Sequence, residues 1–197
     1  MKKIKIYKTI LLFLIIAIII VSILIIIKYA KRYKTEKNAK SIIQNIKQEN
    51  LQSQNLTDEI NEEIDGYKVI GIIKIPKINI EYPILEKTTI ESLNLSITRF
   101  WGNKINEIGN VTLAGHNNLN GKMFGKINKL EKGDIIELTD AQNITVKYEV
   151  FDTYVVDPND ISCIMQVEEG TREVTLITCK NGRSNRFIVK AREIINK

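Results

Sequence analysis

The feature that most constrains the fold is an unbroken apolar run from Ile10 to Ile27, in which Ser22 is the one polar residue. As a helix rising about 1.5 Å per residue, this run spans about 27 Å, close to the thickness of a bilayer core. A cleaved signal peptide has a shorter apolar region ending in small residues. Here the run continues directly into Lys28-Tyr29-Ala30-Lys31-Arg32. We therefore predict an uncleaved transmembrane anchor over residues 10–27.

The net charge of +6 is concentrated around this anchor. Residues 1–40 hold ten of the 29 basic residues and one of the 23 acidic residues, which leaves 19 basic and 22 acidic residues and a charge near −3 for the rest. A domain with that balance lacks the basic surface that nucleic-acid binding needs. We predict contact with the lipid bilayer and no nucleic-acid partner. Lysines lie on both sides of the anchor, so charge alone does not decide its orientation.

Residues 28–66 are rich in Lys, Asn, Gln and Glu and contain no proline. Isoleucines recur with partial helical spacing, at Ile42, Ile43, Ile46, Ile60 and Ile64. This pattern predicts a partly helical stalk, and a partly disordered spacer is an equally compatible reading.

From residue 67 to 197 the pattern changes to short β-branched runs separated by turn signals. The predicted strands are Val69 to Ile75, Ile78 to Ile84, Asn110 to Gly115, Asp134 to Leu138, Ile144 to Val156, Glu173 to Cys179 and Arg186 to Ile194. Thr88 to Leu95 and Lys122 to Leu130 are predicted helices. Many strands with few helices favour an all-β domain closed, or nearly closed, into a barrel, because an open sheet would leave long edges.

The chain has two cysteines, Cys163 and Cys179, and one histidine, His116. This set offers no close pair of metal ligands, so we predict neither a metal nor another cofactor. A disulfide between the cysteines is possible outside the cell. We favour two free thiols, with Cys163 as a small buried side chain and Cys179 as a working nucleophile.

Three features of the sequence are typical of acyl transfer through a thiol. They are a cysteine that ends the strand Thr175-Leu176-Ile177-Thr178-Cys179, an arginine that begins the next strand, and a single imidazole. A cation stabilises the thiolate, and a proton donor serves the leaving group. Gly115 precedes His116 at a strand end, which allows the backbone to present the imidazole there.

These segments resemble the sortases, membrane-anchored cysteine transpeptidases of Gram-positive bacteria. The resemblance rests on Leu113-Ala114-Gly115-His116-Asn117, on Thr175 to Cys179 with the following Arg186-Phe187-Ile188-Val189, and on matching segments around Pro76, Pro83 and Gly133. It covers about Val69 to Ile194. It implies an eight-stranded barrel in which His116, Cys179 and Arg186 meet at a groove, with residues 1–9 in the cytoplasm and the catalytic domain outside the cell.

The resemblance also implies substrates and partners. Cys179 would cleave a sorting signal like Leu-Pro-x-Thr-Gly after its threonine, on secreted proteins, and transfer the protein to an amine of a cell-wall precursor or of another protein. Arg186 is favoured over Arg183 as the residue that stabilises the oxyanion, and Thr178 shapes that site. The loop between Asp157 and Arg172 would bind the signal through Ile161, Ile164, Met165 and Val167. The compact domain fits class A or class D, with class D slightly favoured.

Two other functions remain open at this point. A cysteine peptidase would hydrolyse the same thioester, and an inactive anchored module would keep the fold and bind without reacting.

Overall fold

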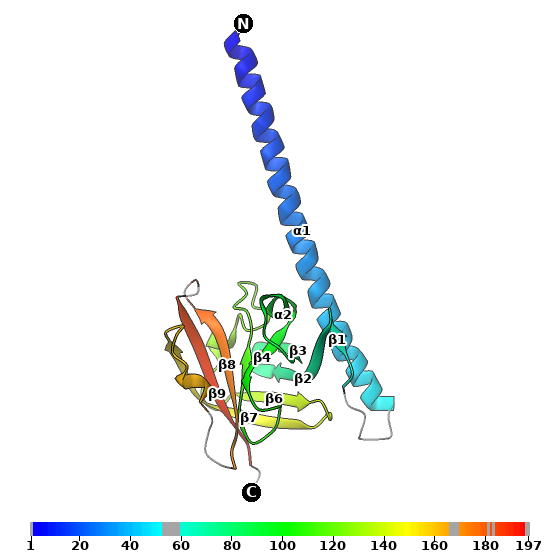
Figure 1. Ribbon diagram of the computed structural model, residues 1–197, viewed down its shortest axis with the longest axis vertical. Helices are drawn as coiled ribbons and strands as arrows, with labels where there is room; N and C mark the ends of the chain where they lie inside the picture. The colour runs from blue at the N-terminus through cyan, green and yellow to red at the C-terminus, as the bar shows by residue number, and fades with distance from the viewer. Residues whose placement is uncertain (1, 53–59, 166–169, 181, 183, 196–197) are drawn as a thin grey trace. The chain divides into compact units, whose positions relative to one another are not determined.

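The apolar run lies within one long helix, α1 (Lys2–Gln52), in the computed structural model, which describes residues 2–52, 60–165, 170–180, 182 and 184–195 (Figure 1). Ser22 donates its hydroxyl to the carbonyl oxygen of Ile18 at 2.8 Å, so the hydroxyl inside the run has a partner within the helix. Over the described ranges, α1 is the one helix long and apolar enough to cross a membrane, and its most apolar 18-residue window has a mean hydropathy of 3.8.

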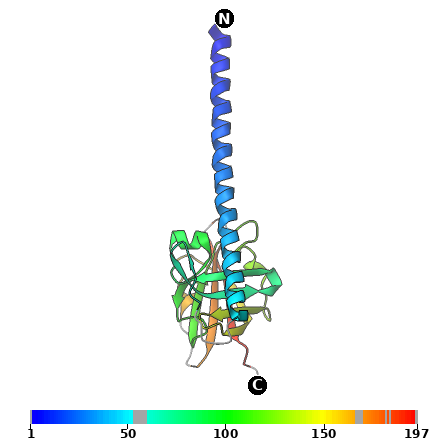
Figure 2. The ribbon, with the colours of Figure 1, turned by 90° about the vertical axis from the view of Figure 1, so that its right-hand side faces the viewer.

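The chain divides into two compact units, residues 1–38 and residues 39–197. The last turns of α1 belong to the second unit and lie beside its strands (Figure 2). There Ile42 and Ile46 pack on Ile64 and Val69. Apolar side chains four residues apart form one face of a helix, so this part of the predicted stalk has a stripe to bury. Residues 39–46 therefore pack on the strands that follow.

Eight strands among the described residues close into a barrel in the order β2-β3-β4-β5-β8-β9-β7-β6, with β6 pairing back onto β2. The predicted eight-stranded barrel is confirmed. The strands are β1 (Glu63–Ile64), β2 (Tyr67–Ile75), β3 (Ile80–Leu85), β4 (Ile97–Gly102), β5 (Gly109–Ala114), β6 (Ile135–Asp140), β7 (Thr145–Val156), β8 (Arg172–Lys180) and β9 (Asn185–Glu193). The short helices are η1 (Pro76–Ile78), α2 (Ile90–Leu95), η2 (Ile127–Lys129) and η3 (Ser162–Ile164).

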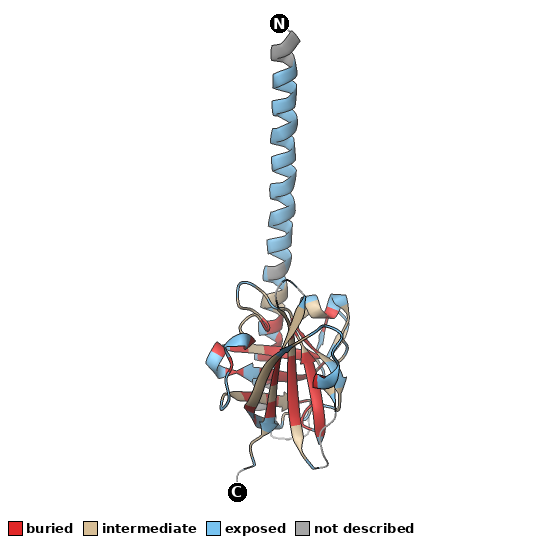
Figure 3. Cartoon of the chain, turned by 90° about the vertical axis from the view of Figure 1, so that its left-hand side faces the viewer, coloured by how far each residue is buried: buried red, intermediate tan, exposed pale blue. Residues whose placement is uncertain are grey.

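The barrel interior is filled by alternate side chains of its strands. The buried residues of these strands are coloured red in Figure 3. On the strands next to the candidate site these are Val111 and Leu113 of β5, Val174 and Leu176 of β8, and Val189 and Ala191 of β9. Because successive strand residues point to opposite faces, these core positions also identify the residues that face outwards.

Two local predictions were wrong. β4 was not among the predicted strands, although Ile97-Thr98-Arg99-Phe100-Trp101 has β-forming residues, because its apolar positions do not alternate cleanly. The helix predicted over Lys122 to Leu130 is a turn followed by the single 3-10 turn η2. Met123 has a φ of +49°, and Gly125 lies against the carbonyl oxygen of Asn118, so the chain turns sharply where a helix would run on.

Candidate active site

Two predicted site residues are paired across neighbouring strands, close to the point where the chain passes from β8 to β9. Cys179 on β8 lies directly opposite Arg186 on β9 in the antiparallel register. Directly opposed residues share one face of a sheet. Since Leu176 points into the core and Thr178 is buried on the same side, Cys179 and Arg186 both lie on the outer face of the barrel. The Cys179 thiol is free and half-buried.

His116 follows the end of β5, the strand on the other side of β8. The two strands pair in parallel as far as Ala114 and Ile177. The next residue continues this ladder, because the Gly115 N–H donates to the Ile177 carbonyl at 3.2 Å. The backbone of His116 therefore leaves the sheet beside the last residues of β8.

Two side chains hold the His116 segment against the end of β8. The Thr178 hydroxyl donates to the Gly115 carbonyl at 2.7 Å. The side-chain amide of Asn117 donates to the carbonyl oxygen of Cys179 at 2.8 Å. The residues immediately before and after His116 are thus each bonded to β8, and the histidine backbone is fixed next to Cys179.

Gly115 is required by the packing of this segment. A Cβ atom at Gly115 would lie 2.8 Å from Cδ2 and 3.0 Å from Cγ of Phe124, and 3.3 Å from a side-chain carbon of Ile97. The Phe124 ring is itself fully buried, and the Phe124 N–H donates to the His116 carbonyl at 3.1 Å. A larger residue would displace the ring or the backbone that carries the histidine.

The segment after β7 packs on the outer face of β5 and β8, next to Asn110 and Thr175. Thr175 donates its hydroxyl to the Asn110 side-chain oxygen at 2.9 Å, and both residues are fully buried. The Asn110 amide donates in turn to the carbonyl oxygens of Cys163 and Met165, at 3.4 and 3.3 Å. This buried pair fixes residues 163–165 to the barrel.

This loop carries the residues predicted to bind the substrate. Ile161 and Met165 expose 67% and 63% of their surface, and Ile164 is half-buried. Exposed apolar side chains on a loop fixed to the same face as Cys179 can contact an extended peptide. Val167 and the alternative arginine Arg183 lie outside the described residues.

The two thiols have different surroundings. Cys163 is buried, and burial, followed by the nearby charge of Asp160, raises its pKa. The thiolate is the reactive form of cysteine, so Cys163 is held in its unreactive form. Cys179 lies instead at the end of a strand beside a guanidinium-bearing residue, an arrangement that can carry out acyl transfer.

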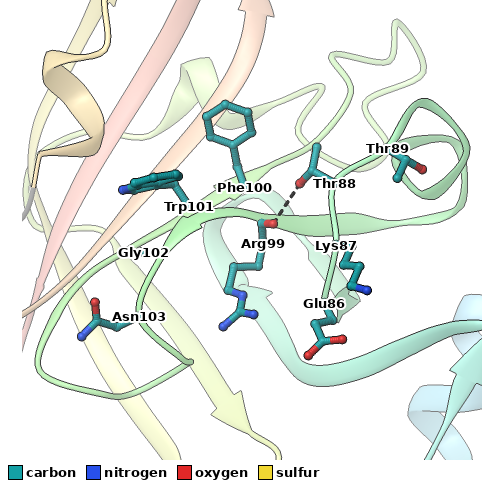
Figure 4. A pocket seen from close by; sticks show the side chains of 9 residues that line it. All are labelled: Glu86, Lys87, Thr88, Thr89, Arg99, Phe100, Trp101, Gly102 and Asn103. Atoms are coloured by element: carbon teal, nitrogen blue, oxygen red, sulfur yellow. Dashed lines mark hydrogen bonds between the residues drawn. The ribbon is translucent and has the colours of Figure 1, made fainter.

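A pocket of about 750 Å³ opens along β4, and Figure 4 shows its lining. Phe100 and Trp101 expose about half of their surfaces there, beside Arg99, whose carbonyl accepts from the Thr88 hydroxyl at 2.9 Å. The register of β4 against β5 shifts between Arg99 and Trp101, which marks a β-bulge at Phe100. The lining contains neither a thiol nor an imidazole, so the pocket is separate from the Cys179 site.

Within the part of the chain that the structure describes, no group of three or more His, Cys, Asp or Glu side chains lies close enough to hold a metal ion. Glu107, the one acid between Trp101 and Asn110, accepts from the backbone N–H of Lys104 at 3.3 Å and pairs with its ammonium group at 3.7 Å. The Glu107 carboxylate therefore already has partners within its own turn.

Sequence reasoning missed two asparagines. Asn110 and Asn117 each bond to a residue more than 50 positions away, so no local pattern identifies their roles. Asn117 follows His116 directly, and that adjacency was the one signal available in the sequence.

The chain is similar to known proteins in both sequence and structure. Residues 73–194 match the family model of the Sortase domain. The chain is 34% identical to Sortase A of Bacillus anthracis over 137 residues, covering 68% of this chain and 64% of that protein. It is 34% identical to Sortase D of Bacillus subtilis over 110 residues, covering 55% of this chain and 53% of that protein. The chain thus spans between about half and two thirds of these relatives.

Among solved structures, a Clostridium perfringens Sortase D5 transpeptidase superimposes with a TM-score of 0.61 at 27% identity. The superposition covers 81% of this chain and 98% of that one.

Proposed function

The chain belongs to the sortase family, and on that basis we propose that it is a cysteine transpeptidase with Cys179 as its nucleophile. Its substrates are secreted proteins with a sorting signal like Leu-Pro-x-Thr-Gly. The observation that carries the proposal is the pairing of Cys179 with Arg186, beside the segment that presents His116.

In the first half of the reaction, the Cys179 thiolate attacks the carbonyl carbon of the signal's threonine. The tetrahedral intermediate collapses, the bond between that carbon and the glycine nitrogen breaks, and His116 as imidazolium protonates the departing amine. The substrate protein is then held on Cys179 as a thioester. In the second half, an acceptor amine attacks the thioester, neutral His116 takes its proton, and the thiolate is released.

Arg186 stabilises the negative charge that develops on the threonine oxygen. Its location opposite Cys179 on the same face supports this role. A guanidinium is planar, always charged and able to donate two parallel hydrogen bonds, so it suits an oxyanion. A backbone carbonyl, that of Asn185, accepts one Arg186 N–H at 3.2 Å, which orients the side chain at the start of β9.

The signal's Leu-Pro portion binds against the loop after β7. Ile161, Ile164 and Met165 supply apolar surface there, and Val167 extends the same loop in sequence. Thr178 shapes the site by holding the residue before His116, since its hydroxyl donates to the Gly115 carbonyl.

An N-terminal apolar helix and membership of the sortase family fit a membrane-anchored protein. We further propose that residues 1–9 are cytoplasmic and that the catalytic domain, from about residue 67, is extracellular. There the thioester can meet its acceptor, an amine of a cell-wall precursor or of a neighbouring protein. The compact domain favours a class D or class A type.

The test is incubation of the full chain, in detergent micelles, with a labelled signal peptide in the presence and absence of an amine. We expect cleavage after threonine and, with the amine, an amide product that replaces the hydrolysed one. Cleavage without any amide product would identify a peptidase. Binding without cleavage would identify an inactive anchored module.

A further inference from the structure

The parallel ladder between β5 and β8 ends just where the reacting residues begin. Its last backbone pair is Ala114 with Ile177, followed by the bond from the Gly115 N–H to the Ile177 carbonyl. In a parallel ladder, the next bond of the same kind would run from the N–H of residue 117 to the carbonyl of Cys179. The side-chain amide of Asn117 fills that place, at 2.8 Å.

The chemistry of this contact is unambiguous. A carbonyl oxygen can only accept, so the Asn117 group that faces Cys179 is its NH₂. The backbone of Asn117 also pairs with Met123, and the Phe124 N–H donates to the His116 carbonyl. The loop that carries His116 is therefore closed on itself. Before His116, Gly115 is bonded to Ile177 and Thr178 of β8, and after His116 the Asn117 side chain bonds to Cys179.

We propose that Asn117 is a positioning residue that keeps the imidazole of His116 within reach of the Cys179 thiol. The inference rests on the proposed function, because it assigns a task to the same site. Asn117 is exposed and contributes little to the core, so its amide acts mainly through the bond to Cys179. Losing that bond frees the His116 loop to move relative to the strand, and misplacement by about 1 Å can cost about 100-fold in rate.

Asn117→Asp tests the donor specifically. The side chain keeps its shape, but a carboxylate cannot donate to the Cys179 carbonyl, whereas the protonated acid can. A carboxyl facing a carbonyl oxygen is stabilised in its neutral form, which raises its pKa. Near pH 8, the activity of Asn117→Asp should therefore be about 10- to 100-fold lower than that of wild type. This relative activity should recover as the pH falls towards about 5.

Two variants calibrate this result. Asn117→Ala removes the donor at every pH, so its relative activity should stay low without recovery. Asn120→Asp adds the same charge in the same loop, but Asn120 uses its side-chain oxygen to accept from the Lys122 N–H at 3.1 Å, and aspartate keeps that acceptor. Its relative activity should match wild type across the pH range.

A second measurement separates this inference from the proposed function. The rate of alkylation of Cys179 by iodoacetamide, followed by mass spectrometry against pH, needs no sorting signal and reports the thiolate fraction. We expect the alkylation profile of both Asn117 variants to differ from that of wild type, and the profile of Asn120→Asp to match it. If both Asn117 variants show the same alkylation and cleavage profiles as wild type, the inference is overturned. A wild-type chain that cleaves no signal peptide would overturn the proposed function, while the alkylation profiles would still decide the role of Asn117.

Discussion

Cys179 at the end of β8 lies directly opposite Arg186 at the start of β9, on the outer face of the barrel. The two residues are only seven positions apart in sequence, so the short connection between the strands fixes their relation. His116 reaches the same place from a strand more than 60 residues earlier. The site therefore depends on the neighbouring positions of β5, β8 and β9 in the closed barrel.

Replacing Arg186 with lysine should lower kcat about 100-fold, because lysine keeps the positive charge but loses the planar pair of donors for the oxyanion. Steady-state cleavage of a signal peptide measures this loss. Lys180→Ala is the matched control: Lys180 is the next residue after Cys179, and its ammonium lies over the Phe187 ring at 5.5 Å. An equal loss in Lys180→Ala would indicate a general effect of charge near the thiol.

Cys163→Ser should leave cleavage nearly unchanged, because Cys163 is buried and its raised pKa keeps it protonated. Cys179→Ala should abolish cleavage. Peptide mapping of the native chain after brief alkylation should find the label on Cys179 alone. A disulfide between residues 163 and 179 in the active protein would contradict the assignment of a free nucleophile.

Gly115→Ala should destabilise the domain by about 1–3 kcal/mol and reduce activity, since the added methyl group meets the Phe124 ring. Thermal unfolding with and without the second change Phe124→Leu measures the contact. The double variant should lose less stability than the two single losses added together. Strict additivity would show that the ring does not limit residue 115.

Stability should decline at alkaline pH partly through Tyr154. Burial, followed by nearby negative charge at Cys163 and Asp152, raises the pKa of Tyr154 to about 12, above its ordinary value of about 10. The folded state then holds this proton longer than the unfolded state, so stability is lost as the pH rises from about 10 through about 12. The free energy of unfolding, measured with denaturant across that pH range, should fall less steeply in Tyr154→Phe than in wild type. Parallel curves for the two proteins would remove Tyr154 as a cause.

The barrel could be predicted because its strands show strong β-branched patterns, with turn signals at Pro76 after β2 and at Gly133 before β6. Pro83 does not mark a strand end, because it lies inside β3 opposite Ile72. Prediction failed at β4, where a bulge at Phe100 breaks the alternation, and at Lys122 to Leu130, where contacts of Gly125 override local helical preference.

The positions of His116, Cys179 and Arg186 at strand ends followed from sequence and family resemblance. The bond between Asn117 and Cys179 did not, because it joins residues 62 positions apart. Only the closed sheet shows that they are neighbours.

The most direct test of the central claim is mass spectrometry of the covalent intermediate. The full chain is mixed with peptides of the form Leu-Pro-x-Thr-Gly, quenched in acid to preserve the thioester, and digested. We predict an added mass on the peptide that contains Cys179, equal to the signal up to and including its threonine, and its loss when an amine is added before quenching. Cleavage of the signal with no adduct on Cys179, or with undiminished rate in Cys179→Ala, would contradict the assignment of Cys179 as the acyl carrier.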